Sequence, residues 1–325
     1  MANEDVGTPY TKGSSFRARA EARQRTYRAQ TLAAGWKGYG HLLDDDALEA
    51  RRNFITREAW QAARDRQAAG KGVAERTFRN MLSSQAMCFN IFATLQADAK
   101  LATRILGRLV PGLIQVQTMA FEYTPSNDVF GDQTGQGGVD CDLLIEGLWD
   151  GGPGILVMET KFVEPEFSIC GFRKHERIAK NKPMCPEDVP VKSDAHACLY
   201  ESSKHYLYWA RSLEHDTLNA ASLPEKGCPF GGELWQLWVN HTLAHVEASR
   251  RKAEVACYAV CAPASNNELL QNGEVLSRFR ALVKDPSTVL FIDVDRLIDE
   301  ILSASYGNAS LADWARGLQA RYHRI

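Results

Sequence analysis

The chain has 325 residues, of which 45% are hydrophobic and 24% are charged, proportions that exclude a mainly disordered or fibrous protein. There are 38 Lys and Arg residues against 40 Asp and Glu residues, and the net charge of −2 excludes a uniformly basic nucleic-acid-binding protein. No apolar run approaches the roughly 20 residues that span a bilayer, and the first ten residues contain acids and no apolar segment. We therefore expect a cytoplasmic protein without a membrane partner, whose eight cysteines are thiols or metal ligands rather than disulfides.

The first 74 residues are polar and indicate a basic helical extension. Between Lys12 and Lys37 there are seven basic residues and a single acid, Glu21. Two interpretations are open. The segment is either a solvated helix or an arm that contacts the phosphates of a nucleic acid.

The middle of the chain changes from helical to strand periodicity. A wide apolar face over residues 75–96 predicts a buried helix, and a shorter helix is expected over 99–109, before a Pro-Gly pair. Strands are then expected over 113–123, 139–149 and 155–162, with a glycine-rich turn between the last two. The first half of the third strand is continuously apolar, which is typical of a strand buried on both faces.

The second half of the chain predicts fewer regular elements. Residues 163–232 are irregular apart from a helix expected over 199–213. The remaining expected elements are a helix over 231–250, strands over 255–263 and 288–295, and helices over 296–303 and 311–322. The order of elements predicts an α/β fold in which helices flank a mixed central β-sheet.

Two acids and a lysine occupy the ends of the two strands of the expected hairpin. Asp142 lies near the start of one strand, and Glu159 and Lys161 end the next. Glu159 and Lys161 share a face because side chains alternate along a strand. Two carboxylates and an ammonium group at the end of a sheet are costly to desolvate without a partner. A divalent cation supplies that partner, and hard oxygen ligands favour Mg²⁺ or Mn²⁺.

Such a site predicts metal-assisted attack of water on a phosphodiester, because a metal polarises the phosphate and lowers the pKa of its bound water. Lys161 would orient or deprotonate the water, or stabilise charge in the transition state. An E-x-K triplet also arises by chance, and an ion pair at the edge of the sheet is the alternative. The upstream acid, the hairpin and the later helix–strand unit favour the catalytic interpretation.

The pattern D-x(16)-E-x-K across a hairpin, within the order helix, three strands, helix, strand, resembles the PD-(D/E)XK nuclease superfamily, the fold of many restriction endonucleases. The resemblance covers about residues 75–263 and rests on the segments SSQAMCFNIF, VDCDLLIEG, ILVMETKFVEP and ELWQLWVNHTLA. It implies that Asp142 and Glu159 are metal ligands and that Lys161 is the catalytic lysine.

The resemblance also bears on positions outside the E-x-K triplet. Many members have a Gln on the helix after E-x-K, which Gln236 matches, and an acid on the first helix, for which Glu75 is the candidate. Gln236 either contacts the metal-bound water or the DNA backbone, or it caps the helix or faces solvent. Cys141 stands where the family has proline, and Asp140, two residues before Asp142, is an alternative ligand.

Four cysteines after the E-x-K triplet form a second candidate metal site. Cys170, Cys185, Cys198 and Cys228 are separated by 14, 12 and 29 residues and lack CxxC pairs. They either bind Zn²⁺ or an iron–sulfur cluster, which would stabilise an irregular segment, or they are buried unpaired thiols.

These patterns predict three parts, namely a basic helical extension over 1–74, a nuclease-like domain over 75–303 with a cysteine-containing insertion over 163–232, and a C-terminal helix over 304–325. The expected function is a Mg²⁺-dependent endonuclease that hydrolyses DNA, and the resemblance implies an enzyme of the bacterial restriction or defence type. The alternatives are a non-catalytic nucleic-acid-binding module on the same fold and a structural protein built around a cysteine–metal site. DNA is the expected partner, and a homodimer is left open.

Overall fold

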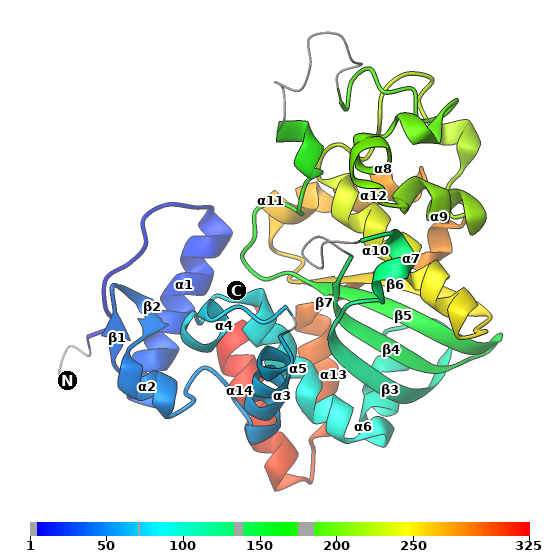
Figure 1. Ribbon diagram of the computed structural model, residues 1–325. Helices are drawn as coiled ribbons and strands as arrows, with labels where there is room; N and C mark the ends of the chain where they lie inside the picture. The colour runs from blue at the N-terminus through cyan, green and yellow to red at the C-terminus, as the bar shows by residue number, and fades with distance from the viewer. Residues whose placement is uncertain (1–4, 71, 133–138, 175–184) are drawn as a thin grey trace.

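A mixed β-sheet forms the centre of the molecule. The computed structural model describes residues 5–70, 72–132, 139–174 and 185–325, and in these residues the sheet has five strands (Figure 1). Strands β3, β4 and β5 pair antiparallel, whereas β5, β6 and β7 pair parallel. Their spatial order is also their order in the chain: β3 (Leu113–Tyr123), β4 (Cys141–Trp149), β5 (Gly152–Thr160), β6 (Val255–Ala262) and β7 (Val289–Asp293). The expected α/β fold with a mixed sheet is confirmed.

Helices cover both faces of the sheet (Figure 1). In β5, Leu156 and Met158 contact one helical layer, and Ile155 and Val157 contact the other. The run is continuously apolar because neither face meets water. One layer contains α3 (Arg57–Ala68), α4 (Arg76–Arg79), α5 (Ser84–Ala97), α6 (Ala99–Leu106), α13 (Val294–Ala304) and α14 (Ala309–Tyr322). The other contains α7 (Asn127–Phe130), α8 (Leu199–Lys204), α9 (Tyr208–Glu214), α10 (Leu234–Arg250), α11 (Asn267–Leu270) and α12 (Glu274–Arg280).

Two expected helices are each divided in the structure. The helix expected over 75–96 is split into α4 and α5, because Asn80 is extended and its Oδ1 accepts a hydrogen bond from the N–H of Leu82 at 2.9 Å. Ser83 then caps α5 by accepting from the N–H of Ala86. The helix expected over 199–213 breaks at His205, whose φ of 59° is left-handed.

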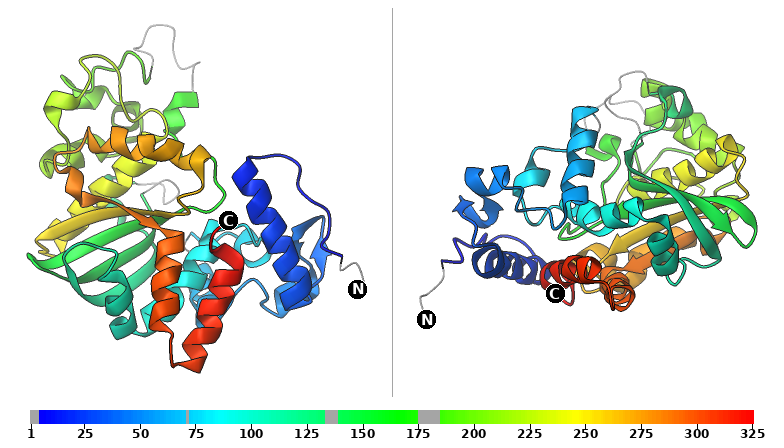
Figure 2. Two further views of the ribbon diagram at one scale, coloured as in Figure 1. Left: turned by 180° about the vertical axis from the view of Figure 1, so that it is seen from behind. Right: turned by 90° about the horizontal axis from the view of Figure 1, so that it is seen from below.

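The N-terminal residues form a small subdomain that packs against the C-terminal helix. It contains α1 (Ser15–Tyr27), a π-helical turn over 28–32, β1 (Trp36–Lys37), β2 (Tyr39–Leu43) and α2 (Asp45–Glu49). Helix α1 lies beside α14 in both views (Figure 2). The two helices are joined by buried side chains: Gln24 Nε2 donates to the carbonyl of Arg321 at 2.8 Å, and Arg321 Nε donates to Gln24 Oε1 at 3.0 Å.

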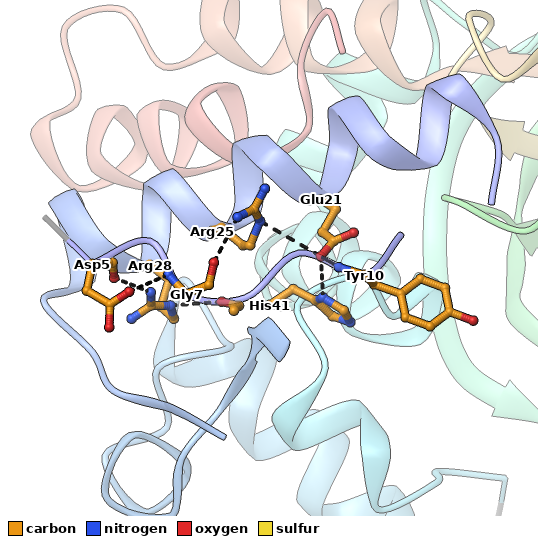
Figure 3. Close-up of polar contacts among 8 residues, drawn as sticks. Asp5, Gly7, Tyr10, Glu21, Arg25, Arg28 and His41 are labelled. Atoms are coloured by element: carbon orange, nitrogen blue, oxygen red, sulfur yellow. Dashed lines mark hydrogen bonds and ion pairs between the residues drawn. The ribbon is translucent and has the colours of Figure 1, made fainter. Parts of the chain in front are cut away.

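Three arginines of the N-terminal segment bind within the protein, and two of them, Arg25 and Arg28, are drawn in Figure 3. Arg25 Nη1 donates to the carbonyl of Gly7 at 2.9 Å, and Arg28 donates to the carbonyls of Gly40 and Asp5, both at 2.8 Å. The neighbouring Arg23 binds carbonyls of the last C-terminal residues. These contacts give the three arginines a role in holding the fold together, and the phosphate-contacting arm stays a prediction.

No helix in the described ranges is both long enough and apolar enough to cross a membrane. The division of the chain into three parts over 1–74, 75–303 and 304–325 stays a prediction.

Candidate active site

The hairpin of β4 and β5 brings the predicted acids together. Leu143 pairs with Met158, so Asp142 and Glu159 come next on the two neighbouring strands. The residue after Glu159 links the two acids: Thr160 donates its N–H to Asp142 Oδ2 at 2.6 Å and its hydroxyl to the same oxygen at 2.5 Å. Asp142 is thereby held against the carboxyl end of β5.

Glu159 is fixed by three donors. Its Oε1 accepts a hydrogen bond from Gln236 Nε2 at 2.7 Å and lies 2.9 Å from Lys161 Nζ, and its Oε2 accepts from Asn240 Nδ2 at 3.0 Å. Gln236 and Asn240 lie one turn apart on α10, so they share one face of that helix. Gln236 Oε1 also accepts from the N–H of Ser168 at 3.0 Å. Gln236 therefore faces the acids instead of solvent.

Lys161 follows β5 directly, where the strand pairing continues for one more bond. Its N–H donates to the carbonyl of Cys261 in β6 at 2.9 Å. The Lys161 side chain is buried, and its Nζ lies 6.0 Å from the ring centroid of Phe167. Burial by itself lowers the pKa of Lys161, but the carboxylates of Glu159 and Glu164 outweigh burial and raise it. The amine is therefore charged at neutral pH.

These residues line a cleft with a volume of about 870 Å³. Asp142, Glu159, Lys161 and Gln236 all contribute to its wall, as does the alternative ligand Asp140. Glu75, the candidate acid on the first helix, does not line this cleft. Glu75 is exposed, and its Oε2 accepts from Gln67 Nε2 at 2.9 Å. In the cleft, Ser84 and Gln85 are the residues that α5 supplies.

A third buried acid in the cleft is absent from the sequence prediction. Glu122 lies on β3 between Phe121, which pairs with Leu143, and Tyr123, which pairs with Cys141. This register places it opposite Asp142. Its side chain is 5% exposed, and its φ of 46° is left-handed, a conformation that costs about 1–2 kcal/mol for a residue with a Cβ. Strained residues of this kind concentrate at functional sites. The only sequence signal was an acid near the end of an alternating strand.

Comparison with known proteins agrees with this geometry. A family model described as the PD-(D/E)XK nuclease superfamily matches residues 11–187, more than half of the chain. The chain belongs to the PD-(D/E)XK nuclease superfamily. No curated protein and no solved structure matches it. The matched range contains α1 and the β4–β5 hairpin, whereas α10, with Gln236 and Asn240, lies outside it.

Three acids of the cleft have raised pKa values, which means that the site disfavours their charged forms. Burial, together with the charge of Glu159, raises the pKa of Asp142 to about 7. Burial also raises the pKa of Glu159, despite the nearby Lys161. Burial and the charge of Asp142 raise the pKa of Glu122 to about 9. A bound cation would offset the repulsion that holds these carboxyl pKa values high.

The donor set fits a hard divalent cation. Among the described residues, no three His, Cys, Asp or Glu side chains converge closely enough to hold an ion by themselves. Mg²⁺ does not require such a cage, because it keeps several waters and binds through one or two carboxylates plus substrate phosphates. Asp142 uses Oδ2 for Thr160, and no donor in the described ranges reaches its Oδ1. That oxygen is available to a cation.

The four cysteines of the second candidate site lie near one another: burial raises the pKa of Cys228, and the other three thiols raise it further. The N–H of Cys228 donates to the carbonyl of Pro186, the residue after Cys185, at 2.7 Å. Burial raises the pKa of Cys170 to about 11 and that of Cys185 to about 12. All four, including Cys198, are free thiols, and they are among the described side chains that form no three-ligand cluster. Zinc or iron–sulfur binding here stays a prediction.

Proposed function

We propose that the protein is a metal-dependent endonuclease that hydrolyses DNA phosphodiester bonds. The observation that carries the proposal is the set of Asp142, Glu159 and Lys161 at the ends of β4 and β5 in one cleft. Superfamily membership supports the class of reaction. DNA as the substrate, and a role in bacterial restriction or defence, are part of the proposal.

Each residue of the set has a distinct role in this reaction. Asp142 and Glu159 would hold Mg²⁺ or Mn²⁺, and a bound cation would polarise the scissile phosphate and lower the pKa of its water. Gln236 and Asn240 keep the Glu159 carboxylate pointed into the cleft. Outer partners of this kind orient metal ligands and raise metal affinity.

Lys161 acts as a charged group in this proposal. Its raised pKa keeps it protonated at neutral pH, so it does not remove a proton from water in that state. The ammonium instead stabilises the negative charge that develops on the phosphate in the transition state. We therefore expect Lys161→Ala to lower kcat by about 10²–10³ while DNA binding is retained.

A nuclease assay tests the proposal. The purified protein is incubated with circular DNA, linear DNA and RNA in Mg²⁺, and in parallel with EDTA. An endonuclease converts circular DNA to nicked and linear forms, and EDTA abolishes the conversion. Binding of DNA without cleavage under any of these conditions would favour the alternative, a non-catalytic binding module. The complete Asp142, Glu159 and Lys161 set argues against that alternative, since a binding module needs none of the three.

A further inference from the structure

Two arginines line the cleft without a carboxylate partner. Arg17 lies in the first turn of α1 and Arg76 begins α4. The same cleft contains the carboxylates of Glu122, Asp140, Asp142, Glu159, Glu164 and Glu166. In the described part of the chain, neither arginine forms an ion pair or side-chain hydrogen bond with any of them. A guanidinium group that lines the same cleft as six acids, yet is paired with none of them, is available to an external anion.

Arg17 is held in place by its surroundings. Its guanidinium carbon lies 5.1 Å from the ring centroid of Tyr10. Its Nε is buried, and no hydrogen-bond acceptor in the described residues satisfies it. An unsatisfied buried donor lowers the stability of the folded protein, and a bound ligand that supplies an acceptor would remove this cost. Phe16, the preceding residue, packs edge-on against Phe162 with ring centroids 6.4 Å apart. Phe162 directly follows Lys161, so the start of α1 lies beside the catalytic strand.

The other basic residues of the N-terminal segment are placed differently. Arg23, Arg25 and Arg28 bind backbone carbonyls, and Lys37 pairs with Asp45 at 3.6 Å. Arg19 is exposed and lies over the ring of Phe16, outside the cleft wall. Within the basic stretch from Lys12 to Lys37, Arg17 is the residue that lines the cleft in the described structure.

We propose that Arg17 and Arg76 bind backbone phosphates of the nucleic acid in this cleft. The planar guanidinium group matches two phosphate oxygens at once. Such contacts would offset the repulsion between the phosphates and the six carboxylates and position the scissile bond over Asp142 and Glu159. This inference rests on the proposed nuclease function and assigns to the N-terminal helix a part in substrate binding.

The salt dependence of DNA binding tests the inference. A fluorescent duplex is titrated with the full-length protein in Ca²⁺, from about 50 to 200 mM KCl, and its integrity is checked afterwards. Each lost phosphate contact should lower the slope of log K against log[salt] by about 0.9. Arg17→Ala and Arg76→Ala should each show that decrease, and Arg17→Lys should restore most of it. Arg19→Ala, a change on the same helix outside the cleft, should keep the wild-type slope.

The outcomes separate this inference from the proposed function. If the wild-type protein cleaves DNA and binds it with a steep salt slope that neither alanine variant changes, the arginine assignment is wrong and the nuclease proposal stands. A slope lost equally in Arg17→Ala and Arg17→Lys, with a lowered Tm, would assign Arg17 to folding and contradict the inference. A wild-type protein that neither binds nor cleaves nucleic acid would refute both.

Discussion

At the scale of single residues, the site depends on how Glu159 is held. Its carboxylate has two partners on α10, Gln236 at 2.7 Å and Asn240 at 3.0 Å, and one beside it, Lys161 at 2.9 Å. Asn240 is 1% exposed, so contacts within the protein, and not water, determine the orientation of its amide. The two α10 side chains fix the direction in which the carboxylate faces the cleft.

Removing the Asn240 amide should weaken the proposed catalysis while the proposed metal ligand Glu159 stays in place. We expect Asn240→Ala to lower activity or metal affinity by about 10–100-fold, because outer hydrogen-bond partners of metal ligands have effects of that size. The measurement is the cleavage rate as a function of Mg²⁺ concentration. Ser249→Ala, an exposed change on the same helix, is the control. Identical Mg²⁺ dependence for Asn240→Ala and the control would show that the amide only fills space.

The raised pKa of Asp142 predicts how stability depends on pH without metal. The folded protein keeps the Asp142 proton up to about pH 7, whereas the unfolded chain releases it near pH 4. Between these values the folded state binds more protons, so its stability falls as pH rises. In EDTA the Tm should therefore decrease from pH 5 to pH 8.

Asp142→Asn should remove part of that decrease and have a higher Tm than the wild type at pH 8. Mg²⁺ should raise the wild-type Tm at pH 8 more than that of the variant. Asp150→Asn changes an exposed acid at the other end of the same hairpin and is the control. If Asp142→Asn keeps the full wild-type pH dependence of the Tm, the raised pKa of Asp142 is not the cause of that dependence.

The residues that sequence reasoning found and missed differ in a physical way. That Asp142, Glu159 and Lys161 lie together could be predicted, because a hairpin brings close what lies 17 to 19 positions apart. Glu122 and Asn240 were missed because their contacts depend on the register of β3 and on the rotation of α10 about its axis. Neither quantity can be read from local periodicity.

At the scale of elements, the strands were easier to predict than the helix boundaries. The span of β3, Leu113–Tyr123, agrees with the prediction, because alternation begins directly after a Pro-Gly pair. The break between α4 and α5 was missed, because it depends on backbone hydrogen bonds that the side chains of Asn80 and Ser83 accept in competition with helical ones. The packing of α1 on α14 joins residues about 300 positions apart, and no periodic pattern reports such a contact.

The junction of α1 and α14 predicts a structural cost for changes in the N-terminal segment. Gln24→Ala should lower the free energy of unfolding by about 2 kcal/mol or more, because it leaves buried polar atoms of Arg321 without partners. Urea unfolding measures this change. Gln30→Ala, an exposed Gln in the turn after α1, should leave the midpoint unchanged. A Gln24→Ala midpoint equal to that of the wild type would mean that α1 is only loosely attached.

At the scale of the whole molecule, the cleft is assembled from distant parts of the chain. The N-terminal helix supplies Arg17, the central hairpin supplies the acids and Lys161, and α10 supplies Gln236. The sheet is buried between two helical layers, so β4 and β5 are packed on both faces. Such packing would hold the proposed catalytic groups in the geometry that they need.

The most direct test of the account is the cleavage rate of Glu159→Ala. The variant, the wild type and Asp150→Ala are compared on circular DNA in Mg²⁺, after circular dichroism shows that all three are folded. We predict that Glu159→Ala falls to the background rate, because the cleft loses a proposed metal ligand, while Asp150→Ala cleaves like the wild type. Cleavage by folded Glu159→Ala at the wild-type rate would contradict the assignment of this cleft as the active site.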